Sequence, residues 1–242
     1  MYETLKCAVL RTIKYDDRRS IVTAWSMERG RVSLLVPAGA SREARRRRAL
    51  MMPLGLFEGE ADIRPGRELL SIRDVRPLRV LPDLSSNPVK AVVAMFLSEV
   101  LERVLREAAP DPLLSSYIFD AVELLDSLSN GPGIANFPLV FLYKLGRFTG
   151  IEPDTGSWRP GYVFDMNGGI FRPTAPTAGR WLEADEAEFV RLLDRLSFAS
   201  AARLRLPRAL RRRALDMLLE YYTLHHARLS ELKSLPVVQE IF

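Results

Sequence analysis

The first 80 residues alternate between short apolar runs and polar breaks. Asp16-Asp17, Glu28-Arg29-Gly30 and Pro65-Gly66 stand in the breaks, and β-branched and apolar residues dominate the runs. Runs of this kind, bounded by turn-forming residues, predict β-strands. The strands are expected at residues 5–13, 20–25, 32–36, 52–57 and 69–75. With a short polar segment after the third strand, this pattern fits a small Greek-key barrel, and the OB-fold is the commonest such barrel with one helical insertion.

After Leu81 the apolar residues recur in steps of three and one, which indicates helices. Asn87 is a suitable cap for a helix over residues 88–105, with Pro88 in its first turn. Asp111-Pro112 begins a second helix, which Asn130-Gly131-Pro132 ends. Three further helices are expected at residues 137–148, 184–196 and 207–229. Because each is amphipathic, they must pack together as a bundle.

A segment rich in glycine and proline interrupts the helices at about residues 154–180. It contains Tyr162-Val163-Phe164 and Ile170-Phe171 around Asn167-Gly168-Gly169, a pattern that predicts a β-hairpin. The chain is therefore expected to be an α+β protein of two domains. These are a β-barrel over residues 1–80 and an all-α bundle with a small hairpin insertion over residues 81–242.

Composition narrows the class of protein. Of 242 residues, 48% are hydrophobic and 27% are charged, which is typical of an ordinary globular protein. No apolar run approaches the roughly 20 residues that span a bilayer, and the first residues contain no signal-peptide core. The single cysteine, Cys7, excludes internal disulfides and a cysteine-based zinc site. We expect a cytoplasmic protein.

The positive charge is concentrated near the beginning of the chain. Residues 1–80 hold 17 basic and 10 acidic side chains, whereas residues 81–242 hold 18 and 20. The run Arg45-Arg46-Arg47-Arg48, with Arg42 just before it, is the densest cluster. Four adjacent cations repel one another unless solvent or a polyanion screens them, so the run indicates either a solvated helix or contact with nucleic-acid phosphates. For DNA, the candidate residues are Lys14, Arg18, Arg19, Arg29, Arg31, Arg42, Arg45, Arg46, Arg47 and Arg48.

Aromatic residues that could stack on bases are scarce in this part of the chain. Tyr2, Tyr15, Trp25 and Phe57 are the candidates, and Trp25 and Phe57 have the pattern of core residues. Binding to DNA is therefore expected to be mainly electrostatic, dependent on salt and weakly selective for sequence.

A second basic cluster stands at the start of the last long helix. Its members are Arg203, Arg205, Arg208, Arg211, Arg212 and Arg213. Cations at the beginning of a helix oppose its dipole, so they indicate either an acidic partner or a plain solvated face.

Catalytic motifs are missing from the sequence. It contains no phosphate-binding Gly-x-x-x-x-Gly-Lys loop and no Gly-x-Ser-x-Gly elbow. His225 and His226 are adjacent and point to different faces of a helix, and Cys7 reads as a small core residue. No active site, metal or cofactor is expected. Carboxylates distant in sequence could still converge on Mg²⁺, so a nuclease stays open as an alternative.

The order of several short motifs resembles the RecO family of recombination mediators over nearly the whole chain. The motifs are Asp16-Asp17-Arg18-Arg19 before a strand, Met27-Glu28-Arg29-Gly30-Arg31-Val32, Pro37-Ala38-Gly39-Ala40 before the arginine run, Pro53-Leu54-Gly55-Leu56-Phe57-Glu58, Leu218-Leu219-Glu220-Tyr221-Tyr222, Leu232-Lys233-Ser234-Leu235 and Glu240-Ile241-Phe242. Each is weak alone, and their order and spacing together are fairly specific.

The resemblance implies an OB-fold domain, a helical domain and, in many members, a zinc module with four cysteines. Residues 154–180 occupy the place of that module, but the cysteines are absent. Our hypothesis is that packing of Trp158, Tyr162, Phe164 and Phe171 replaces the metal.

The resemblance further implies a non-enzymatic, nucleoid-associated protein that binds single- and double-stranded DNA and anneals complementary strands. With RecR it would help load RecA on gaps coated by single-stranded-DNA-binding protein (SSB). The acidic, phenylalanine-ended SSB tail needs an apolar pocket with a cationic rim. Candidates are Phe141, Lys144, Leu145, Arg147, Phe148, Arg205 and Arg208, although the aromatic residues fit bundle core slightly better than a pocket. An adapter that binds only proteins is the alternative function.

Overall fold

The structure is a computed structural model that describes residues 1–39, 41–226, 229 and 231–241. Ala40 and Phe242, which belong to the motifs above, lie outside the described residues. The chain divides into two compact units, Met1–Leu128 and Ser129–Phe242. The expected division at residue 80 coincides with the change from strands to helices, and as a domain boundary it stays a prediction.

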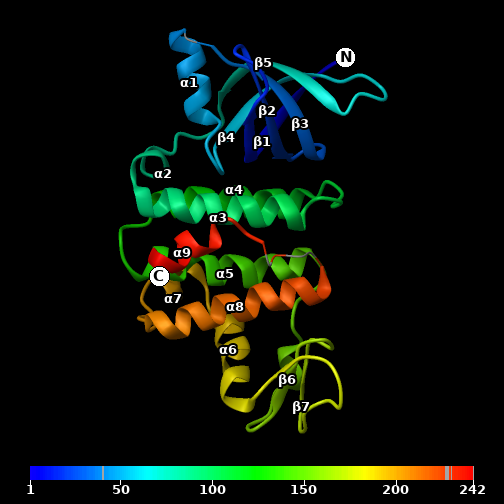
Figure 1. The fold of residues 1–242 in the computed structure, drawn as a ribbon, viewed down its shortest axis with the longest axis vertical. Coiled ribbons are helices and arrows are strands. Elements are labelled where there is room, and N and C mark those ends of the chain that lie inside the picture. Colours follow the sequence, from blue (N-terminus) through cyan, green and yellow to red (C-terminus); the bar gives the residue numbers. More distant parts are fainter. Residues whose placement is uncertain (40, 227–228, 230, 242) are drawn as a thin grey trace. The chain divides into compact units, whose positions relative to one another are not determined.

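The first unit begins with a closed barrel (Figure 1). Neighbouring strands around the barrel are β1, β2, β3, β5 and β4 in that order, and all pairs are antiparallel except β3 with β5. The bounds are β1 (Tyr2–Lys14), β2 (Arg19–Ser26), β3 (Gly30–Pro37), α1 (Arg42–Leu50), β4 (Leu56–Asp62) and β5 (Leu69–Pro77). The expected OB-like barrel, with one helix after its third strand, is confirmed.

Buried and exposed residues alternate along the strands, and the buried ones fill the interior of the barrel. In β3, Val32, Leu34 and Val36 are buried while the residues between them are partly exposed. Cys7 is fully buried in the same core, as expected for a small apolar residue, and burial raises the pKa of its thiol well above the ordinary value. The rest of the barrel core includes Leu5, Val9, Val22, Ala24, Phe57, Ala61, Leu70 and Ile72.

The predicted strand at residues 52–57 is wrong over most of its length. Met51 caps the end of α1, and the chain then turns, with Leu54 at a φ of 59° and the Gly55 N–H donating to Met52 O at 2.9 Å. β4 starts only at Leu56. Met51 and Leu54 are buried although they lie outside any strand, so the apolar run fills space from a turn.

Three helices complete the first unit, and two of them begin at the predicted caps. They are α2 (Pro82–Ser86), α3 (Pro88–Val104) and α4 (Pro112–Ser127). Asn87 Oδ1 accepts from Val89 N at 3.0 Å, and Asp111 Oδ1 accepts from Leu113 N at 2.8 Å. Each cap satisfies an N–H group that a helix start otherwise leaves unpaired.

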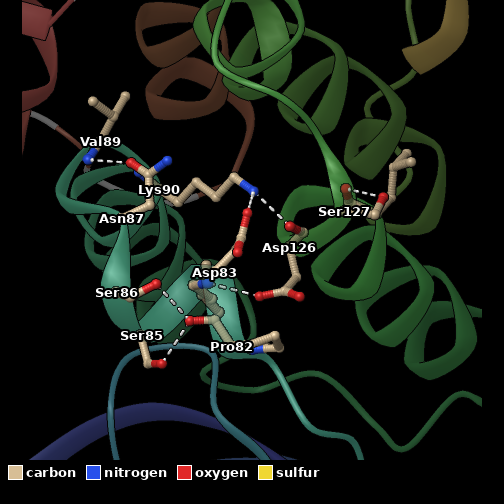
Figure 2. A network of polar contacts seen from close by, with 11 residues as sticks. Pro82, Asp83, Ser85, Ser86, Asn87, Val89, Lys90, Asp126 and Ser127 are labelled. Atoms are coloured by element: carbon tan, nitrogen blue, oxygen red, sulfur yellow. Dashed lines mark hydrogen bonds and ion pairs between the residues drawn. The ribbon is translucent and has the colours of Figure 1, made fainter.

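A buried lysine ties these three helices together (Figure 2). Lys90 on α3 is fully buried, and its Nζ donates to Asp83 Oδ2 at 2.9 Å on α2 and to Asp126 O at 2.5 Å on α4. The Asp126 carboxylate accepts from Leu84 N at 2.6 Å. Asp126 therefore takes part twice: its carboxylate accepts from the main chain of α2, and its main-chain carbonyl accepts from the Lys90 ammonium group.

The second unit is helical with a small sheet inserted. Its bounds are α5 (Pro132–Phe148), η1 (Thr155–Ser157), β6 (Val163–Asp165), β7 (Ile170–Arg172), β8 (Trp181–Leu182), α6 (Ala184–Arg195), α7 (Phe198–Ala201), α8 (Arg208–His225) and α9 (Leu235–Ile241). The expected hairpin is confirmed as the antiparallel pair β6 and β7, with β8 on the other side of β6.

Two helix boundaries in this unit differ from expectation. α5 begins at Pro132 instead of residue 137, because the helix accommodates Pro138 in its interior. α8 ends at His225, four residues before the expected end, and residues 227 and 228 lie outside the described residues. Within the described part of the chain, no helix combines the length and the apolarity needed to cross a bilayer.

Candidate nucleic-acid interface

Helix α1 presents three arginines on one exposed face. Ser41 caps the helix by accepting from Ala44 N at 3.1 Å, and Ala44 is the buried residue of this helix. Arg42, Arg45 and Arg46 are exposed and lie three and four positions apart, so they share one side of the helix. Among the residues that the structure describes, none of these three has an ion-pair partner.

Arg47 and Arg48 hold α1 against the strand that precedes it. Arg47 Nε donates to Pro37 O at 3.3 Å, and Arg48 Nη2 donates to Gly39 O at 3.0 Å. Arg47 also lies 4.0 Å from Glu43 one turn earlier. Both arginines stand in the last turn, where a cation is favourable to the helix dipole. The arginine run therefore has two parts. Arg42, Arg45 and Arg46 form what we call the outward face of α1, and Arg47 and Arg48 form an anchor that attaches the helix to the preceding segment.

The turn between β1 and β2 lies beside this anchor. Ala38 N donates to Arg18 O at 2.6 Å, and Arg19 pairs in register with Pro37. Lys14 ends β1 at the same turn. The structure thus gathers eight of the ten DNA candidates at one end of the barrel, which we call the cationic end. Its residues are Lys14, Arg18, Arg19, Arg42, Arg45, Arg46, Arg47 and Arg48.

The other two candidates lie away from the cationic end. Arg29 and Arg31 flank the turn between β2 and β3, so the length of β3 separates them from α1. Seven steps along a strand correspond to about 23 Å. Arg29 Nη2 lies 2.5 Å from Glu3 Oε2, and Arg31 stands opposite the buried Trp25. The expected ten-residue surface is therefore not continuous.

Acidic residues neutralise part of the cationic end. Lys14 Nζ lies 2.7 Å from Asp17, and Arg19 Nη2 lies 2.6 Å from Asp16. The hydrogen bond from Arg19, together with that from Arg18 N, lowers the pKa of Asp16. Arg18 is exposed and, within the described residues, has no ion-pair partner. At the cationic end, Arg18, Arg48 and the outward face of α1 therefore have no acidic partner among the described residues.

Strands β4 and β5 and the turn that joins them carry paired charges. On β4 and β5, Arg73 Nη2 lies 2.8 Å from Glu60, and Arg76 Nε lies 2.6 Å from Glu58. Arg64, just after β4, lies 2.7 Å from Asp62. These arginines are matched by carboxylates, whereas the cationic end holds a cluster of exposed cations without acidic partners among the described residues.

Tyr15, one of the aromatic residues expected to be available for stacking, lies in the turn that belongs to the cationic end. Tyr15 stands in the β1–β2 turn and is 54% exposed, with Arg19 Cζ 5.0 Å from its ring centroid. Trp25 and Phe57, by contrast, are fully buried, as expected. Asp16 and Asp17, which follow Tyr15 in the sequence, are typical turn residues. Their position next to Tyr15 could have predicted that its ring lies in an exposed turn.

The candidates for an SSB pocket on α5 divide between core and surface. Phe141 and Leu145 are fully buried, and Phe141 stacks on Phe137 with centroids 6.2 Å apart. Lys144 and Phe148 are partly exposed and Arg147 is exposed. These three share one side of α5, so they form the accessible part of the candidate site.

Arg205 and Arg208 belong to a different place in this unit. Asn136 Nδ2 donates to Leu204 O at 2.7 Å, which puts the segment before α8 beside the start of α5. Residue 144 lies about 12 Å further along that helix. Arg208 Nη2 donates to Glu240 O at 2.8 Å and to Gln239 O at 3.2 Å. Arg212 also donates to Gln239 O, so two of the six arginines of the second basic cluster hold the end of α9.

Neither the described histidines nor the acidic residues assemble a metal site. His225 Nε2 lies 2.6 Å from Met166 O, next to the small sheet. Glu186, in the acidic first turn of α6, binds Arg213 at 2.6 Å. Within the described residues, no group of three or more His, Cys, Asp or Glu side chains could hold a metal ion.

The small sheet likewise does not fit a zinc module. Its sequence has no cysteine, and Phe164 packs against Phe171 and Tyr221 with centroids 5.0 and 6.0 Å apart. The Asp165 carboxylate closes the turn by accepting from Asn167 N at 3.1 Å, Gly168 N at 3.0 Å and Arg172 Nε at 2.8 Å. Trp158 and Tyr162 are only partly buried.

Comparisons with known proteins agree with one another. Residues 1–81 match the family described as "Recombination protein O N terminal", and residues 85–236 match "Recombination protein O C terminal". "DNA repair protein RecO" of Phocaeicola vulgatus is 37% identical over 237 residues, which cover 97% of this chain and 96% of the relative. Proteins of the same name from Bacteroides fragilis and Porphyromonas gingivalis are 34% and 33% identical, with coverage of 97% and 98% of this chain and 96% and 98% of the relatives.

Proposed function

This chain belongs to the RecO family of DNA repair proteins, and from that premise we propose that it is a DNA-binding recombination mediator of the RecFOR type. The family consists of mediators rather than enzymes. The proposed mechanism therefore needs no catalytic residue, metal or cofactor. We place the protein in the cytoplasm, associated with the nucleoid.

The cationic end would neutralise the phosphates of two strands and so reduce the repulsion between them. The single observation that carries this proposal is the outward face of α1, where Arg42, Arg45 and Arg46 stand together without acidic partners among the described residues. Charge of this kind binds single- and double-stranded DNA without reading sequence, which is what annealing of arbitrary complementary strands requires.

The partners follow from the family resemblance. With RecR, the protein would help load RecA on gaps coated by SSB. The accessible face of α5, formed by Lys144, Arg147 and Phe148, offers two cations and an aromatic ring to the acidic tail of SSB. Arg205 is a separate exposed cation and Arg208 is engaged with α9, so α5 is the better candidate.

The test is annealing of complementary oligonucleotides precoated with SSB. The native protein should anneal them, and a variant with Arg42→Ala, Arg45→Ala and Arg46→Ala should not. On single-stranded DNA, loss of three phosphate contacts should also reduce the slope of log K against log salt by about 2.

A matched control removes the same charge elsewhere on the barrel. The triple variant Arg64→Ala, Arg73→Ala and Arg76→Ala lowers the net charge equally but alters only residues with acidic partners. It should retain annealing. Equal losses in both variants would mean that net charge, and not the face of α1, is responsible. Absence of DNA binding by the native protein would instead favour an adapter that binds only proteins.

A further inference from the structure

The turn between β1 and β2 holds an aromatic ring in a defined position. Tyr15 N and Asp16 N both donate to Arg19 O at 3.1 Å, which closes the turn. Asp16 Oδ1 accepts from Arg18 N at 2.8 Å inside it. Ala38 N, donating to Arg18 O at 2.6 Å, fastens the turn to the segment that leads into α1. These bonds fix the turn that carries Tyr15 and attach it to the segment that precedes the arginine helix.

The ring is supported on one side and accessible elsewhere. Asp16 holds the Arg19 guanidinium at 2.6 Å, and that guanidinium lies 5.0 Å from the centroid of the Tyr15 ring. The residue is nevertheless 54% exposed. An arginine that packs on one face of an aromatic ring stabilises its orientation and leaves the other face free for a flat ligand.

Charge in this turn differs from charge on α1. The turn pairs Lys14 with Asp17 and Arg19 with Asp16, so only Arg18 contributes an uncompensated cation. The outward face of α1 contributes three. A mostly neutralised turn with an exposed ring suits contact with a base, and an uncompensated cationic helix suits contact with phosphates.

We propose that Tyr15 stacks on an unpaired base of a single strand whose phosphates run along the outward face of α1. This deepens, and rests on, the proposed DNA-binding function. A single strand presents the faces of its bases, whereas a duplex hides them in its stack, so the contact selects single-stranded over double-stranded DNA. The arginines supply affinity for both forms, and Tyr15 supplies the preference between them.

Tyr2 provides a matched control within the same unit. It is 53% exposed, and Arg73 Cζ lies 3.8 Å from its ring centroid. It differs from Tyr15 in location, because it begins β1 and pairs in register with Asp62, among the paired charges of β4 and β5. If any exposed tyrosine backed by an arginine served equally well, both would behave alike.

The experiment measures binding of the full-length protein to fluorescein-labelled oligothymidylate and to a random-sequence duplex by anisotropy over a range of salt. Tyr15→Ala should weaken binding to the single strand by about fivefold or more, the lower end for one stacked base. Duplex binding and the salt slope should stay as in the native protein, because no phosphate contact is removed. Tyr15→Phe should retain binding, and Tyr2→Ala should behave as native.

Two results would overturn the assignment of Tyr15. One is a loss in Tyr15→Ala no larger than in Tyr2→Ala, and the other is an equal loss for single strand and duplex. Thermal unfolding of each variant checks that the barrel is intact, and Tyr15→Phe supplies a second reading if Tyr15→Ala is unstable, since a loss there would contradict stacking. Failure of the native protein to bind either DNA at low salt would be a different outcome, because it overturns the proposed function itself.

Discussion

The indole Nε1 of Trp25 donates a buried hydrogen bond of 2.9 Å to Ser115 Oγ, which joins strand β2 to helix α4 across 90 residues of sequence. The Ser115 hydroxyl in turn donates to Asp111 O at 2.8 Å, the carbonyl of the residue that caps α4. The largest side chain of the barrel is thus satisfied by the helical part of the same unit. The bond links α4 to the barrel within the first compact unit.

Replacement of Ser115 should therefore destabilise the first unit. Ser115→Ala leaves a buried indole N–H without a partner, which costs about 1–3 kcal/mol in the free energy of unfolding. Ser116→Ala is the matched control, because Ser116 is the exposed neighbour whose hydroxyl faces Asp120. Urea unfolding followed by tryptophan fluorescence measures both. Equal stability of the two variants would show that the Trp25 bond contributes nothing.

The buried Lys90 gives a second prediction. Lys90→Ala removes the ammonium group and the packing of its stem, so we expect a loss of about 3 kcal/mol in unfolding free energy. Asp83→Asn should cost less than about 1 kcal/mol, because the Asp83 side chain is 59% exposed and the bond to Asp126 O remains. Denaturant unfolding of both variants measures the two losses in unfolding free energy. A cost for Asp83→Asn as large as for Lys90→Ala would assign the stability to the ion pair.

The turn of the small sheet should respond to acid. Burial opposes ionisation of Asp165, but hydrogen bonds from Gly168 N and Arg172 outweigh it and keep the pKa of Asp165 below its ordinary value. A lowered folded-state pKa contributes stability above the unfolded pKa of about 4, and the contribution is lost as pH falls through the folded value. The stability difference between native protein and Asp165→Asn should therefore shrink from pH 5 downwards.

Thermal unfolding between pH 7 and the acid limit measures this difference. Asp185→Asn, which removes an exposed carboxyl at the start of α6, controls for the general loss of negative charge. A difference that stays constant over the whole range would contradict the role given to Asp165.

The purified protein should hold no structural zinc. The aromatic contacts of Phe164 and the Asp165 turn stand where a four-cysteine module would need thiolates, and the chain's one cysteine is buried in the barrel. Excess EDTA should leave the melting temperature unchanged, whereas removal of structural zinc unfolds small zinc domains. Stoichiometric zinc by elemental analysis, together with a lowered melting temperature in EDTA, would refute this.

Local signals predicted much of the fold. Asn87-Pro88 and Asp111-Pro112 place the starts of α3 and α4 correctly, because a cap and a first-turn proline act within one turn of helix. The prediction of a strand at residues 52–57 was wrong because the structure there is determined by residues distant in sequence. Burial of Met51 and Leu54 depends on what the barrel leaves unfilled beside α1, and an apolar run does not reveal whether it fills that space from a strand or from a turn.

The sequence predicted which residues belong to the candidate DNA-binding site, but it did not predict how they lie relative to one another. The arginine run appears directly in the sequence, and its exposed face follows from helical spacing. The separation of Arg29 from Arg45 depends on which strand ends meet, and the anchoring by Arg47 and Arg48 depends on carbonyl groups that the sequence does not place. On α5, buried residues occur on nearly every side, so spacing alone could not tell Phe141 in the core from Phe148 at the surface.

Arg208 and Arg212 attach the end of α9 through its main chain. Both guanidinium groups bind main-chain carbonyl oxygens of Gln239 or Glu240, and the last carbonyls of any helix are unpaired and electronegative. Every residue type supplies the same carbonyl, so this attachment constrains where the helix ends rather than which side chains stand there. A substitution at an exposed position of α9 such as Val237 therefore leaves this attachment intact, whereas loss of either arginine of α8 removes part of it.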